Sequence, residues 1–312
     1  MINNKTVAVV IPCFKVKQKI GSVISTLPVF IDTIIAVDDC CPEGSGEFIR
    51  ENFSDPRLII LKNSVNLGVG GAVITGYRHA LQIKMDIVVK MDGDGQMDPA
   101  LLPELILPIA QGKCDYTKGN RFYWLDGLKE MPPIRLFGNS VLSFVNKVAS
   151  GYWDVMDPTN GYTAISSKAL SHIQLEKLEK RYFFESDLLF RLGLNKANVM
   201  DIPMEAKYDG EISNLNITNT AMTFPLKYLS RTFKRIFYQY FLRDFNAGSV
   251  SLLLSIPFFS YGSIYGIYKW SESIELHRST PTGTLFLIAL AQIFGMQLLI
   301  SFIHFDVQNQ RH

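Results

Sequence analysis

Two long stretches near the C-terminus contain no charged side chain, and they constrain the fold more than any other feature of this chain. They cover residues 245–268 and 279–303. Each is longer than the roughly 20 residues that an α-helix needs to cross a bilayer. A hairpin buried in a soluble core is the alternative, but two such stretches with only a short polar break between them favour membrane spans. We therefore expect a two-helix transmembrane hairpin over residues 245–312, ending in a short tail.

The segment directly before the first stretch has the pattern of an amphipathic helix. Within residues 224–243, one helical face carries basic side chains and another carries mostly apolar and aromatic ones. An ordinary surface helix is the alternative, but the position before a span favours a helix lying in the headgroup layer. Five basic residues lie here and two lie in the break at residues 269–278. The positive-inside rule then places both ends of the chain in the cytosol.

The first 120 residues alternate short apolar stretches with segments of helical length, which predicts an α/β fold with a mainly parallel sheet and helices on both faces. The strand candidates are residues 7–11, 33–38, 58–62, 87–91 and 115–120. The helix candidates between them are residues 17–27, 46–53, 68–81 and 99–111. Residues 121–215 are less regular, and there we expect helices at 133–148 and 185–194 and strands at 162–166 and 199–208.

Charge and cysteine content narrow the classes of partner. The net charge of +2 gives no argument for nucleic acid, and we expect no nucleic-acid partner. The four cysteines, Cys13, Cys40, Cys41 and Cys114, show no metal-ligand spacing. We therefore expect reduced thiols in a cytosolic domain.

Two aspartates one residue apart follow the strand candidate at residues 87–91. Asp92 and Asp94, with the amide oxygen of Gln96, form a set of hard oxygen ligands of the kind that Mg²⁺ or Mn²⁺ prefers. Ligands of open α/β sheets bind outside the carboxyl ends of the strands, which is where these residues fall. A solvated acidic turn closed by Pro99 is the alternative. The strand before the motif and the helix signal after it favour the metal site.

Two other segments end strands with residues that suit ligand binding. Asp38 and Asp39 follow the strand at residues 33–38, where an acid could accept a hydrogen bond from a nucleotide base or cap a helix. The glycines of residues 66–72 permit the close approach of a ligand or of the sheet. This segment lacks the full Gly-x-Gly-x-x-Gly pattern of dinucleotide-binding proteins.

Taken in order, these segments resemble glycosyltransferase family 2. They are Val9-Val10-Ile11-Pro12-Cys13-Phe14, Val37-Asp38-Asp39, Asn66-x-Gly68 and Asp92-x-Asp94-x-Gln96. The downstream part is similar to the branch that loads sugars onto polyprenyl phosphates, the dolichyl-phosphate mannose synthase and undecaprenyl-phosphate glucosyltransferase type. Its matching segments are Gly119-Asn120-Arg121 and residues 157–162, 183–187 and 231–236, followed by the two spans.

The resemblance covers essentially the whole chain and implies a GT-A fold, a nucleotide-sugar donor, a divalent cation (Mg²⁺ or Mn²⁺) and an inverting displacement. It assigns nucleotide binding to Pro12, Phe14, Asp39, Gly68 and Asp92, and the cation to Asp92, Asp94 and Gln96. The usual Pro-x-Tyr-Asn-Glu start of the family reads Pro12-Cys13-Phe14-Lys15-Val16 here. The acid that often helps to grip the nucleotide is therefore missing from this loop.

A lipid phosphate acceptor would need cations rather than a strong base, because the second pKa of a phosphate monoester is about 6. The candidates for holding that phosphate are Arg121, Lys207, Arg231 and Arg235. We assign Asp157 to positioning or proton acceptance, and Glu185 or Asp187 to the sugar hydroxyls. An acidic helix N-terminus is the alternative for the last two. The predicted catalytic set is thus Asp157, Asp187, Glu185 and Arg121.

We therefore expect a membrane-anchored, metal-dependent glycosyltransferase that moves a hexose or N-acetylhexosamine from a UDP-sugar, rather than from GDP-mannose, to a polyprenyl phosphate. It would act on the cytosolic leaflet, in a bacterial inner membrane, in the biosynthesis of cell-envelope glycans. The alternatives are transfer to a hydroxyl of a glycan or glycolipid, which would need Asp157 or Asp187 as a base, and a non-catalytic nucleotide-sugar-binding membrane module.

The expected domains are a cytosolic catalytic domain at residues 1–218, juxtamembrane helices at 219–244 and the hairpin at 245–312. Small residues such as Gly262 and Gly266 suit self-association through the spans, as a dimer or tetramer. Two spans are too few for a sugar channel, so a separate flippase would have to move the product.

Overall fold

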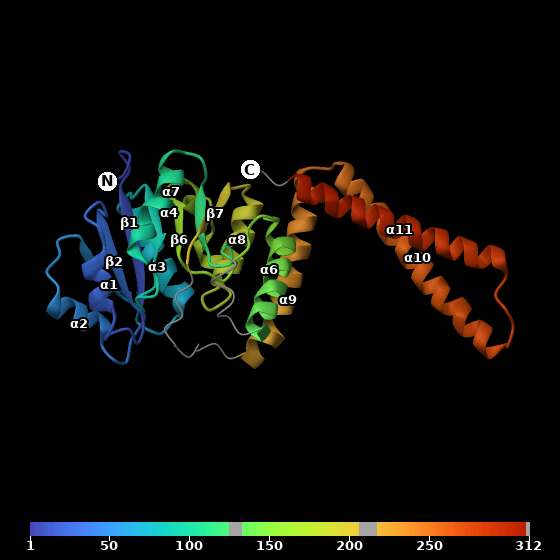
Figure 1. Ribbon diagram of the computed structural model, residues 1–312, viewed down its shortest axis with the longest axis horizontal. Coiled ribbons are helices and arrows are strands. Elements are labelled where there is room, and N and C mark those ends of the chain that lie inside the picture. The colour runs from blue at the N-terminus through green and yellow to red at the C-terminus, as the bar shows by residue number, and fades with distance from the viewer. Residues whose placement is uncertain (125–132, 206–216, 310–312) are drawn as a thin grey trace. The chain divides into compact units, whose positions relative to one another are not determined.

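The computed structural model describes residues 1–124, 133–205 and 217–309 (Figure 1). The chain divides into two compact units, Met1–Thr232 and Phe233–Gln310. The strands, all in the first unit, are β1 (Val7–Cys13), β2 (Thr33–Asp38), β3 (Leu58–Lys62), β4 (Ile87–Lys90), β5 (Tyr116–Asn120), β6 (Thr163–Ser166) and β7 (Val199–Pro203).

Helices flank these strands in the first unit and make up the second. The first unit holds α1 (Ile20–Thr26), α2 (Ser45–Asn52), α3 (Val69–Gln82), α4 (Leu102–Ala110), α6 (Pro133–Ser150), α7 (Ser167–Ser171) and α8 (Phe184–Leu194), with 3₁₀ turns η1 (Pro99–Leu101) and η2 (Leu175–Lys177). Helix α9 (Ile217–Phe237) begins in the first unit and ends in the second. The second unit continues with the π-helical turn η3 (Tyr238–Arg243), α10 (Ala247–Glu275) and α11 (Thr282–Gln308).

Among the described residues the sheet has seven strands in the order β3-β2-β1-β4-β6-β5-β7. Strands β1 to β4 are parallel, and β7 is parallel to β5. Only β6 runs against its neighbours, because it pairs antiparallel with both β4 and β5. The carboxyl ends of six strands therefore meet the start of β6 at one edge of the sheet, which is the edge where α/β proteins bind ligands.

The sheet is buried on both faces because most residues of its central strands are apolar. Alternate residues of β1 point to opposite sides, so that Val9 belongs to one core and Val10 to the other. One core includes Ile20 of α1 and Leu105 of α4, and the other includes Val73 of α3. Helices thus cover both faces, as the alternating sequence pattern predicts (Figure 1).

Strand β1 extends past its partner β4, and this explains the proline inside it. The last pair between the two strands joins Val10 to Lys90. Val10 accepts a hydrogen bond from Met91 on the β4 side, and Pro12, two residues later, points to the same side. Because β4 has already ended there, the missing N–H of Pro12 removes no ladder bond. The end of β1 is thereby left open toward the ligand-binding edge.

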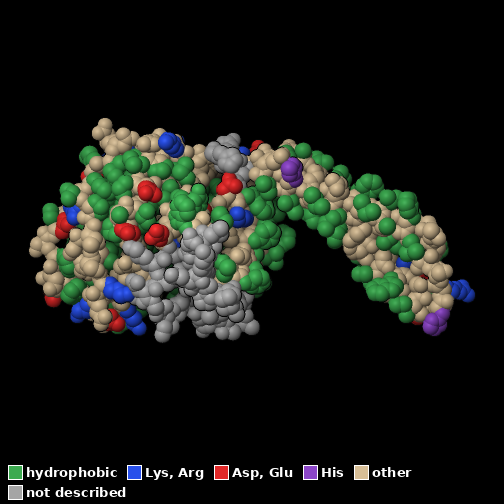
Figure 2. Space-filling model, viewed as in Figure 1, with side chains coloured by type: hydrophobic (Ala, Val, Ile, Leu, Met, Phe, Trp, Pro, Cys, Tyr) green, Lys and Arg blue, Asp and Glu red, His purple; other side chains and the backbone are tan. Residues whose placement is uncertain are grey.

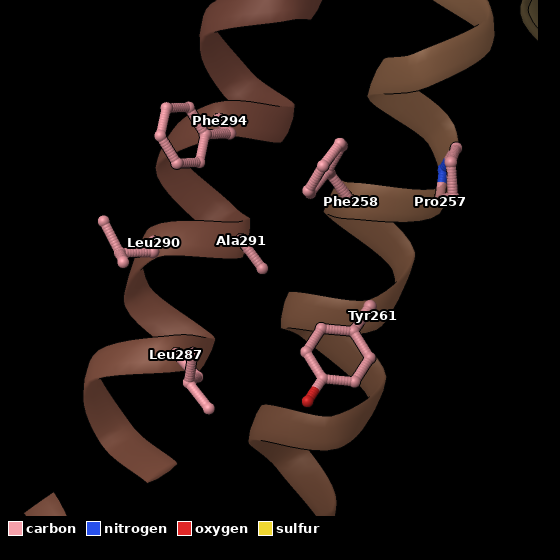
Figure 3. A pocket seen from close by; sticks show the side chains of 7 residues that line it. All are labelled: Pro257, Phe258, Tyr261, Leu287, Leu290, Ala291 and Phe294. Atoms are coloured by element: carbon pink, nitrogen blue, oxygen red, sulfur yellow. The ribbon is translucent and has the colours of Figure 1, made fainter. Parts of the chain in front are cut away.

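The second unit contains two helices long and apolar enough to cross a membrane, α10 and α11. They pack closely because Gly262 and Gly295 leave no side chain between them: a Cβ on Gly295 would lie 2.6 Å from the backbone nitrogen of Phe259. Figure 2 shows hydrophobic side chains along the visible face of this hairpin. Between the helices lies an apolar groove of about 440 Å³. Its lining is Pro257, Phe258, Tyr261, Leu287, Leu290, Ala291 and Phe294 (Figure 3).

The expected fold class is confirmed, and the elements differ from the expected ranges mainly at their ends. Strand β2 and strand β3 match the expected ranges, whereas β7 ends at Pro203 and the expected strand continues to residue 208. The short helix α7 was not expected; its N-cap Ser166 accepts a hydrogen bond from Ala169, a local signal that the apolar pattern does not contain. The predicted boundaries at residues 218 and 244 stay a prediction.

Candidate active site

The candidate site lies where the sheet's strands end, and three of its segments follow three different strands. Asp39 follows β2, Asp92 follows β4 and Arg121 follows β5. The antiparallel strand β6 begins at the same edge, so the loop before it, residues 157–162, reaches the same place. The topology therefore brings together all the predicted motifs of the first unit that follow strands.

The motif after β4 forms a tight turn that fixes its two aspartates. Gln96 donates its backbone N–H to Asp94 Oδ1 at 3.0 Å, and Asp92 donates its own N–H to the sulfur of Met97 at 3.2 Å. Gly95 has φ of +78°, a left-handed conformation that glycine adopts without strain. Desolvation, reinforced by the charge of Asp92, raises the pKa of Asp94. This carboxylate is therefore held near another negative charge in a partly dry place.

The residues of this turn fit a divalent cation that also contacts water and a diphosphate. Within the described residues no cluster of three or more His, Cys, Asp and Glu side chains forms a metal site. Mg²⁺ characteristically takes only one or two protein carboxylates and completes its shell with water and substrate phosphates. A cation beside Asp94 would also relieve the repulsion that raises its pKa. Asp92 and Asp94 supply the one or two carboxylates that such an ion takes from a protein.

A buried lysine forms an ion pair with Asp92. Lys90, the last residue of β4, is 1 % exposed, and its ammonium lies 2.8 Å from Asp92 Oδ1 and 3.3 Å from Glu185 Oε1. Gly161 covers this pair: a Cβ there would lie 2.2 Å from the Lys90 ammonium and 2.9 Å from Asp92 Oδ2. Desolvation opposes the charge of Lys90, but the charges of Asp92 and Glu185 raise the pKa of Lys90 above its usual value.

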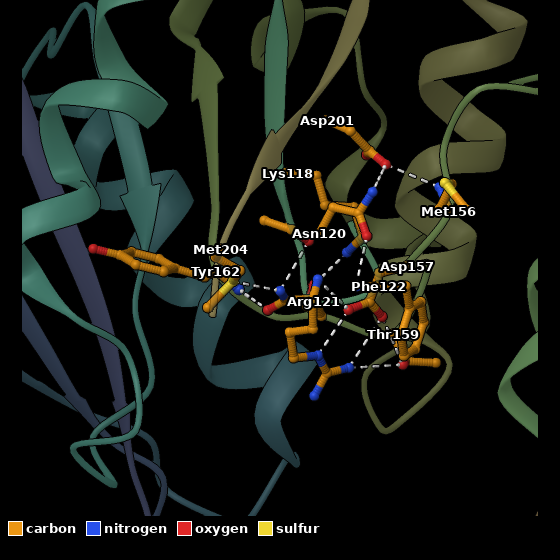
Figure 4. A network of polar contacts seen from close by, with 12 residues as sticks. Lys118, Asn120, Arg121, Phe122, Met156, Asp157, Thr159, Tyr162, Asp201 and Met204 are labelled. Carbon is orange, nitrogen blue, oxygen red and sulfur yellow. Dashed lines mark hydrogen bonds and ion pairs between the residues drawn. The ribbon is translucent and has the colours of Figure 1, made fainter. Parts of the chain in front are cut away.

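Arg121 and Asp157 form the second centre of the site (Figure 4). Arg121 donates to both oxygens of Asp157, with Nε 2.7 Å from Oδ2 and Nη2 3.0 Å from Oδ1. Asp157 is fully buried, whereas a quarter of the Arg121 side chain is exposed. A bidentate pair of this kind fixes the plane of the guanidinium. Asp157 therefore positions Arg121 at the edge of the sheet.

Behind this pair lies a buried polar layer built from β5, β7 and the loop before β6 (Figure 4). Lys118 is fully buried and donates to the carbonyl of Asn160. Desolvation lowers the pKa of Lys118 to about 8. Asp201 accepts hydrogen bonds from the Asn120 side chain at 3.0 Å and from the Met156 backbone at 2.9 Å. These contacts hold the ends of β5 and β7 against the loop that carries Asp157.

Asp39 holds the glycine-rich segment before α3. Its oxygens accept hydrogen bonds from the side chain of Asn63 at 2.8 Å, from Leu67 N at 2.9 Å and from Gly68 N at 2.8 Å. Gly68 has φ of +85°, and a Cβ there would lie 2.8 Å from the carbonyl oxygen of Lys180. Gly68 is thus required because any side chain there would collide with the backbone of Lys180. An ionised carboxylate has about four acceptor positions, and these contacts occupy three of those of Asp39.

A charge network joins α8 to α9 at the other end of the site. Asp187 is fully buried and lies 3.0 Å from both Arg191 and Arg231. Arg231 also contacts Glu179 at 2.9 Å, and Glu179 in turn contacts Lys227 at 2.7 Å. The predicted sugar-binding Asp187 and the predicted phosphate-binding Arg231 are therefore paired with one another.

Comparison with known proteins identifies the family. The sequence model of Glycosyl transferase family 2 matches residues 8–174. The UDP-N-acetylglucosamine–dolichyl-phosphate N-acetylglucosaminyltransferase of Methanococcus voltae is 30% identical over 239 residues, which cover 72% of this chain and 94% of that protein. This chain belongs to glycosyl transferase family 2.

Another relative and two solved structures are also similar to this chain. The undecaprenyl-phosphate mannosyltransferase of Micrococcus luteus is 28% identical over 196 residues, 60% of this chain and 79% of that protein. Glucosyl-3-phosphoglycerate synthase from Mycobacterium tuberculosis, solved with uridine diphosphate, has the same fold: the TM-score is 0.56 at 19% identity, over 73% of this chain and 80% of that one. The same enzyme was also solved with Mn²⁺ and UDP-glucose, and that structure matches with a TM-score of 0.53 at 20% identity, over 73% of this chain and 79% of that one.

Two of the predicted acceptor ligands of this glycosyltransferase, Arg235 and Lys207, stay predictions. Arg235 belongs to the second unit, where it is 1 % exposed and makes a bidentate contact with Asp306 at 2.8 Å and 2.9 Å. Lys207 lies outside the described residues. Phe14, predicted to line the base, is 41% exposed, and Lys15 lies over its ring. The predicted roles of all these residues stay predictions.

Sequence reasoning missed Lys90, Lys118, Gly161 and Asp201. One signal was present in the sequence, and a second appears only in the structure. Lysine is almost never fully buried unless it is paired, so Lys90 at the end of an apolar strand predicts a buried carboxylate nearby. Lys90 and Lys118 also face Thr163 from the two neighbouring strands, but this register appears only once β6 is placed between them.

The buried position of Asp201 predicts a pH-dependent stability. Desolvation raises the pKa of Asp201 to about 6, whereas the pKa of an unfolded aspartate is about 3.9. Between these values the folded protein keeps a proton that the unfolded chain has lost, so stability decreases as the pH rises through this window. We expect the wild type to gain about 1 kcal/mol relative to Asp201→Asn between pH 7.5 and pH 5. Melting of both proteins in the same detergent at several pH values measures this difference. A difference that does not change with pH would contradict the assignment.

Proposed function

We propose that this glycosyltransferase transfers a sugar from a nucleotide diphosphate sugar to the phosphate of a polyprenyl phosphate. The relatives support this acceptor, because the named proteins of Methanococcus voltae and Micrococcus luteus are dolichyl-phosphate and undecaprenyl-phosphate transferases. The first of them also favours UDP-N-acetylglucosamine as the donor. Attack by a phosphate oxygen in line with the departing diphosphate would invert the configuration at the sugar.

One observation carries the choice of a phosphate acceptor: each predicted catalytic carboxylate is already paired with a cation. Asp157 gives both oxygens to Arg121, Asp187 contacts Arg191 and Arg231, and Glu185 contacts Lys90. A hydroxyl acceptor needs a base with an uncommitted lone pair. A phosphate acceptor brings its own negative charge near neutral pH. The pairing therefore favours an acceptor that requires no base.

In this proposal the chain's residues bind and orient two anionic groups. A divalent cation at Asp92 and Asp94, with Gln96, would neutralise the charge that develops on the diphosphate leaving group. Arg121, fixed by Asp157, would hold a phosphate of the donor or acceptor at the sheet edge. Because the bidentate contact with Asp157 fixes the guanidinium plane, Arg121 needs little reorganisation to hold a phosphate.

Exposed apolar side chains support an acceptor that comes from a membrane. Helices α6 and α9 pack together through Phe183, Phe224, Tyr228 and Ala149. Both leave large hydrophobic side chains exposed: Phe137, Val141 and Phe144 on α6 and Leu226 and Leu229 on α9. Such patches on a monomer mark a membrane or protein contact. With α10 and α11 as spans, we propose that this surface lies in the headgroup layer on the cytosolic side.

The proposed function is tested by incubating the purified protein in mixed micelles with undecaprenyl phosphate, Mn²⁺ and a panel of radiolabelled nucleotide sugars. We expect one donor to give a labelled lipid that mild acid hydrolyses, and EDTA to stop the reaction. Undecaprenol, which lacks the phosphate, is the matched control and should give no product. Equal transfer to undecaprenol would support a hydroxyl acceptor instead. Nucleotide-sugar binding without turnover under any condition would support a non-catalytic module.

The remaining expectations follow from this proposal and stay open to experiment. A product made on the cytosolic leaflet would need a separate flippase to reach the other side. Self-association as a dimer or tetramer, and a location in a bacterial inner membrane, likewise stay predictions.

A further inference from the structure

Lys90 has no role in the predicted set of site residues, although it contacts Asp92 and Glu185. Its side chain is 1 % exposed, and its ammonium contacts one carboxylate after β4 and one at the start of α8. Burial of an ammonium is costly unless charges of opposite sign surround it. The desolvation of the Lys90 ammonium next to Asp92 therefore needs an explanation beyond the packing of β4.

The contact with Lys90 fixes the orientation of the Asp92 carboxylate. Asp92 Oδ1 lies 2.8 Å from the Lys90 ammonium, which takes one of its acceptor positions. Oδ2 lies beside Gly161, whose missing side chain leaves the space in which this oxygen sits. The carboxylate cannot rotate without breaking the ion pair. Lys90 thus holds the Asp92 carboxylate in one orientation at the end of β4.

The same ammonium connects the two halves of the site. Glu185, at the second position of α8, is 3.3 Å from Lys90 and its side chain is only 10 % exposed. Without a cation between them, Asp92 and Glu185 would repel each other in a partly dry environment. Lys90 therefore holds the end of β4 and the start of α8 at a constant separation.

We propose that Lys90 is a positioning residue of the donor site, which fixes Asp92 so that one oxygen faces the metal–nucleotide complex. This inference rests on the proposed function, because it assumes that Asp92 binds such a complex. Partners of metal ligands that lie one shell out commonly account for a factor of about 10 to 100 in metal affinity or activity. We therefore expect the loss of Lys90 to weaken the binding of Mn²⁺ in the presence of UDP by about tenfold or more.

The test measures Mn²⁺ binding to the full-length protein in detergent, using the electron paramagnetic resonance signal of free Mn²⁺, with UDP and, in a parallel titration, with GDP. Lys90→Met should raise the dissociation constant of Mn²⁺ by about tenfold or more. The matched control is Lys5→Met, which removes an exposed lysine paired with Asp86 at the opposite edge of the sheet. That variant should bind Mn²⁺ as the wild type does. A Lys90→Met protein with wild-type Mn²⁺ affinity would overturn the proposal.

Two further variants keep the test decisive if Lys90→Met folds poorly. The double variant Lys90→Met with Glu185→Met removes both charges at once, which buried ion pairs often tolerate. It should fold and show the same weakened Mn²⁺ binding, because Asp92 still lacks its contact with the Lys90 ammonium. Glu185→Gln keeps the contact between Lys90 and Asp92, so it should lose less Mn²⁺ affinity than Lys90→Met does. Equal losses in Glu185→Gln and Lys90→Met would assign the effect to Glu185 and overturn the proposal.

These outcomes separate this inference from the proposed function. A wild-type protein that binds no Mn²⁺ with either nucleotide would contradict the metal-dependent function itself. A wild type that binds Mn²⁺ with UDP, together with a Lys90→Met protein that binds equally well, would contradict only the role of Lys90.

Discussion

Replacing Asp94 by Asn lowers the rate of sugar transfer about a thousandfold, equivalent to about 4 kcal/mol of transition-state stabilisation. Asp94 lies in the turn after β4, and desolvation and the charge of Asp92 raise its pKa. A neutral amide has the same shape but cannot balance a divalent cation against a departing diphosphate. The measurement is the initial rate of labelled lipid formation at saturating donor and acceptor.

Asp98 offers a matched control for this substitution in the same loop. Its carboxylate accepts a hydrogen bond from Ala100 N at 2.9 Å and caps the turn η1. Asparagine caps a helix about as well as aspartate, so Asp98→Asn should transfer sugar at close to the wild-type rate. If Asp94→Asn is as active as Asp98→Asn, the cation is not held by Asp94.

Replacing Asp306 by Ala destabilises the second unit by about 3–5 kcal/mol, because it leaves the buried guanidinium of Arg235 without its charged partner. Arg235 is 1 % exposed and Asp306 is 6 % exposed. Tyr240 also donates a hydrogen bond to Asp306, at 2.6 Å. The measurement is the midpoint of unfolding in detergent, monitored with a probe attached to the hairpin.

The pair Lys269–Glu272 in the same unit is the control for this prediction. These residues are 2.5 Å apart at the more exposed end of α10. This pair is more exposed than Arg235–Asp306, with side chains that are 23 % and 35 % exposed. Because more exposed pairs contribute less, Glu272→Ala should lose much less stability than Asp306→Ala. The double variant Arg235→Met with Asp306→Leu should regain most of the stability lost in Asp306→Ala, since it leaves no unpaired charge. Equal unfolding midpoints for Asp306→Ala and Glu272→Ala would contradict this account of the pair.

The parts of the fold that depend on local pattern were predictable from the sequence. Strands β2 and β3 are short apolar stretches bounded by turn residues, and their expected ranges match the observed ones. The position of Asp92 and Asp94 at a strand end follows from the same pattern, because the motif comes directly after the buried residues of β4. The two long apolar helices α10 and α11 were predictable from length and the absence of charge alone.

Most ion pairs of the site were not predictable, because they join residues far apart in the chain. Arg121 and Asp157 are 36 residues apart, and Asp187 and Arg231 are 44 apart. In the second unit, Arg235 and Asp306 are 71 residues apart. The sequence shows Arg121, Asp157, Asp187, Arg231 and Arg235 as candidates for binding a ligand. Only the tertiary structure reveals that each of them is paired with another charged side chain.

The direction of β6 is the other feature that local pattern could not provide. Thr163–Ser166 was expected as a strand, but its insertion between β4 and β5 depends on pairing with both. That insertion brings Gly161 against Lys90 and Asp92, and Asn160 against Lys118. The buried layer below the site therefore exists because of a long-range pairing, and no single segment encodes it.

The most direct test of the central claim is a crystal structure of the protein with Mn²⁺ and UDP, with data collected for the anomalous scattering of manganese. The account predicts one anomalous peak at the carboxyl end of β4, in contact with Asp92 Oδ2, Asp94 and the diphosphate, while Asp92 Oδ1 stays on Lys90. A diphosphate bound without manganese, or a manganese peak that touches neither aspartate, would contradict it.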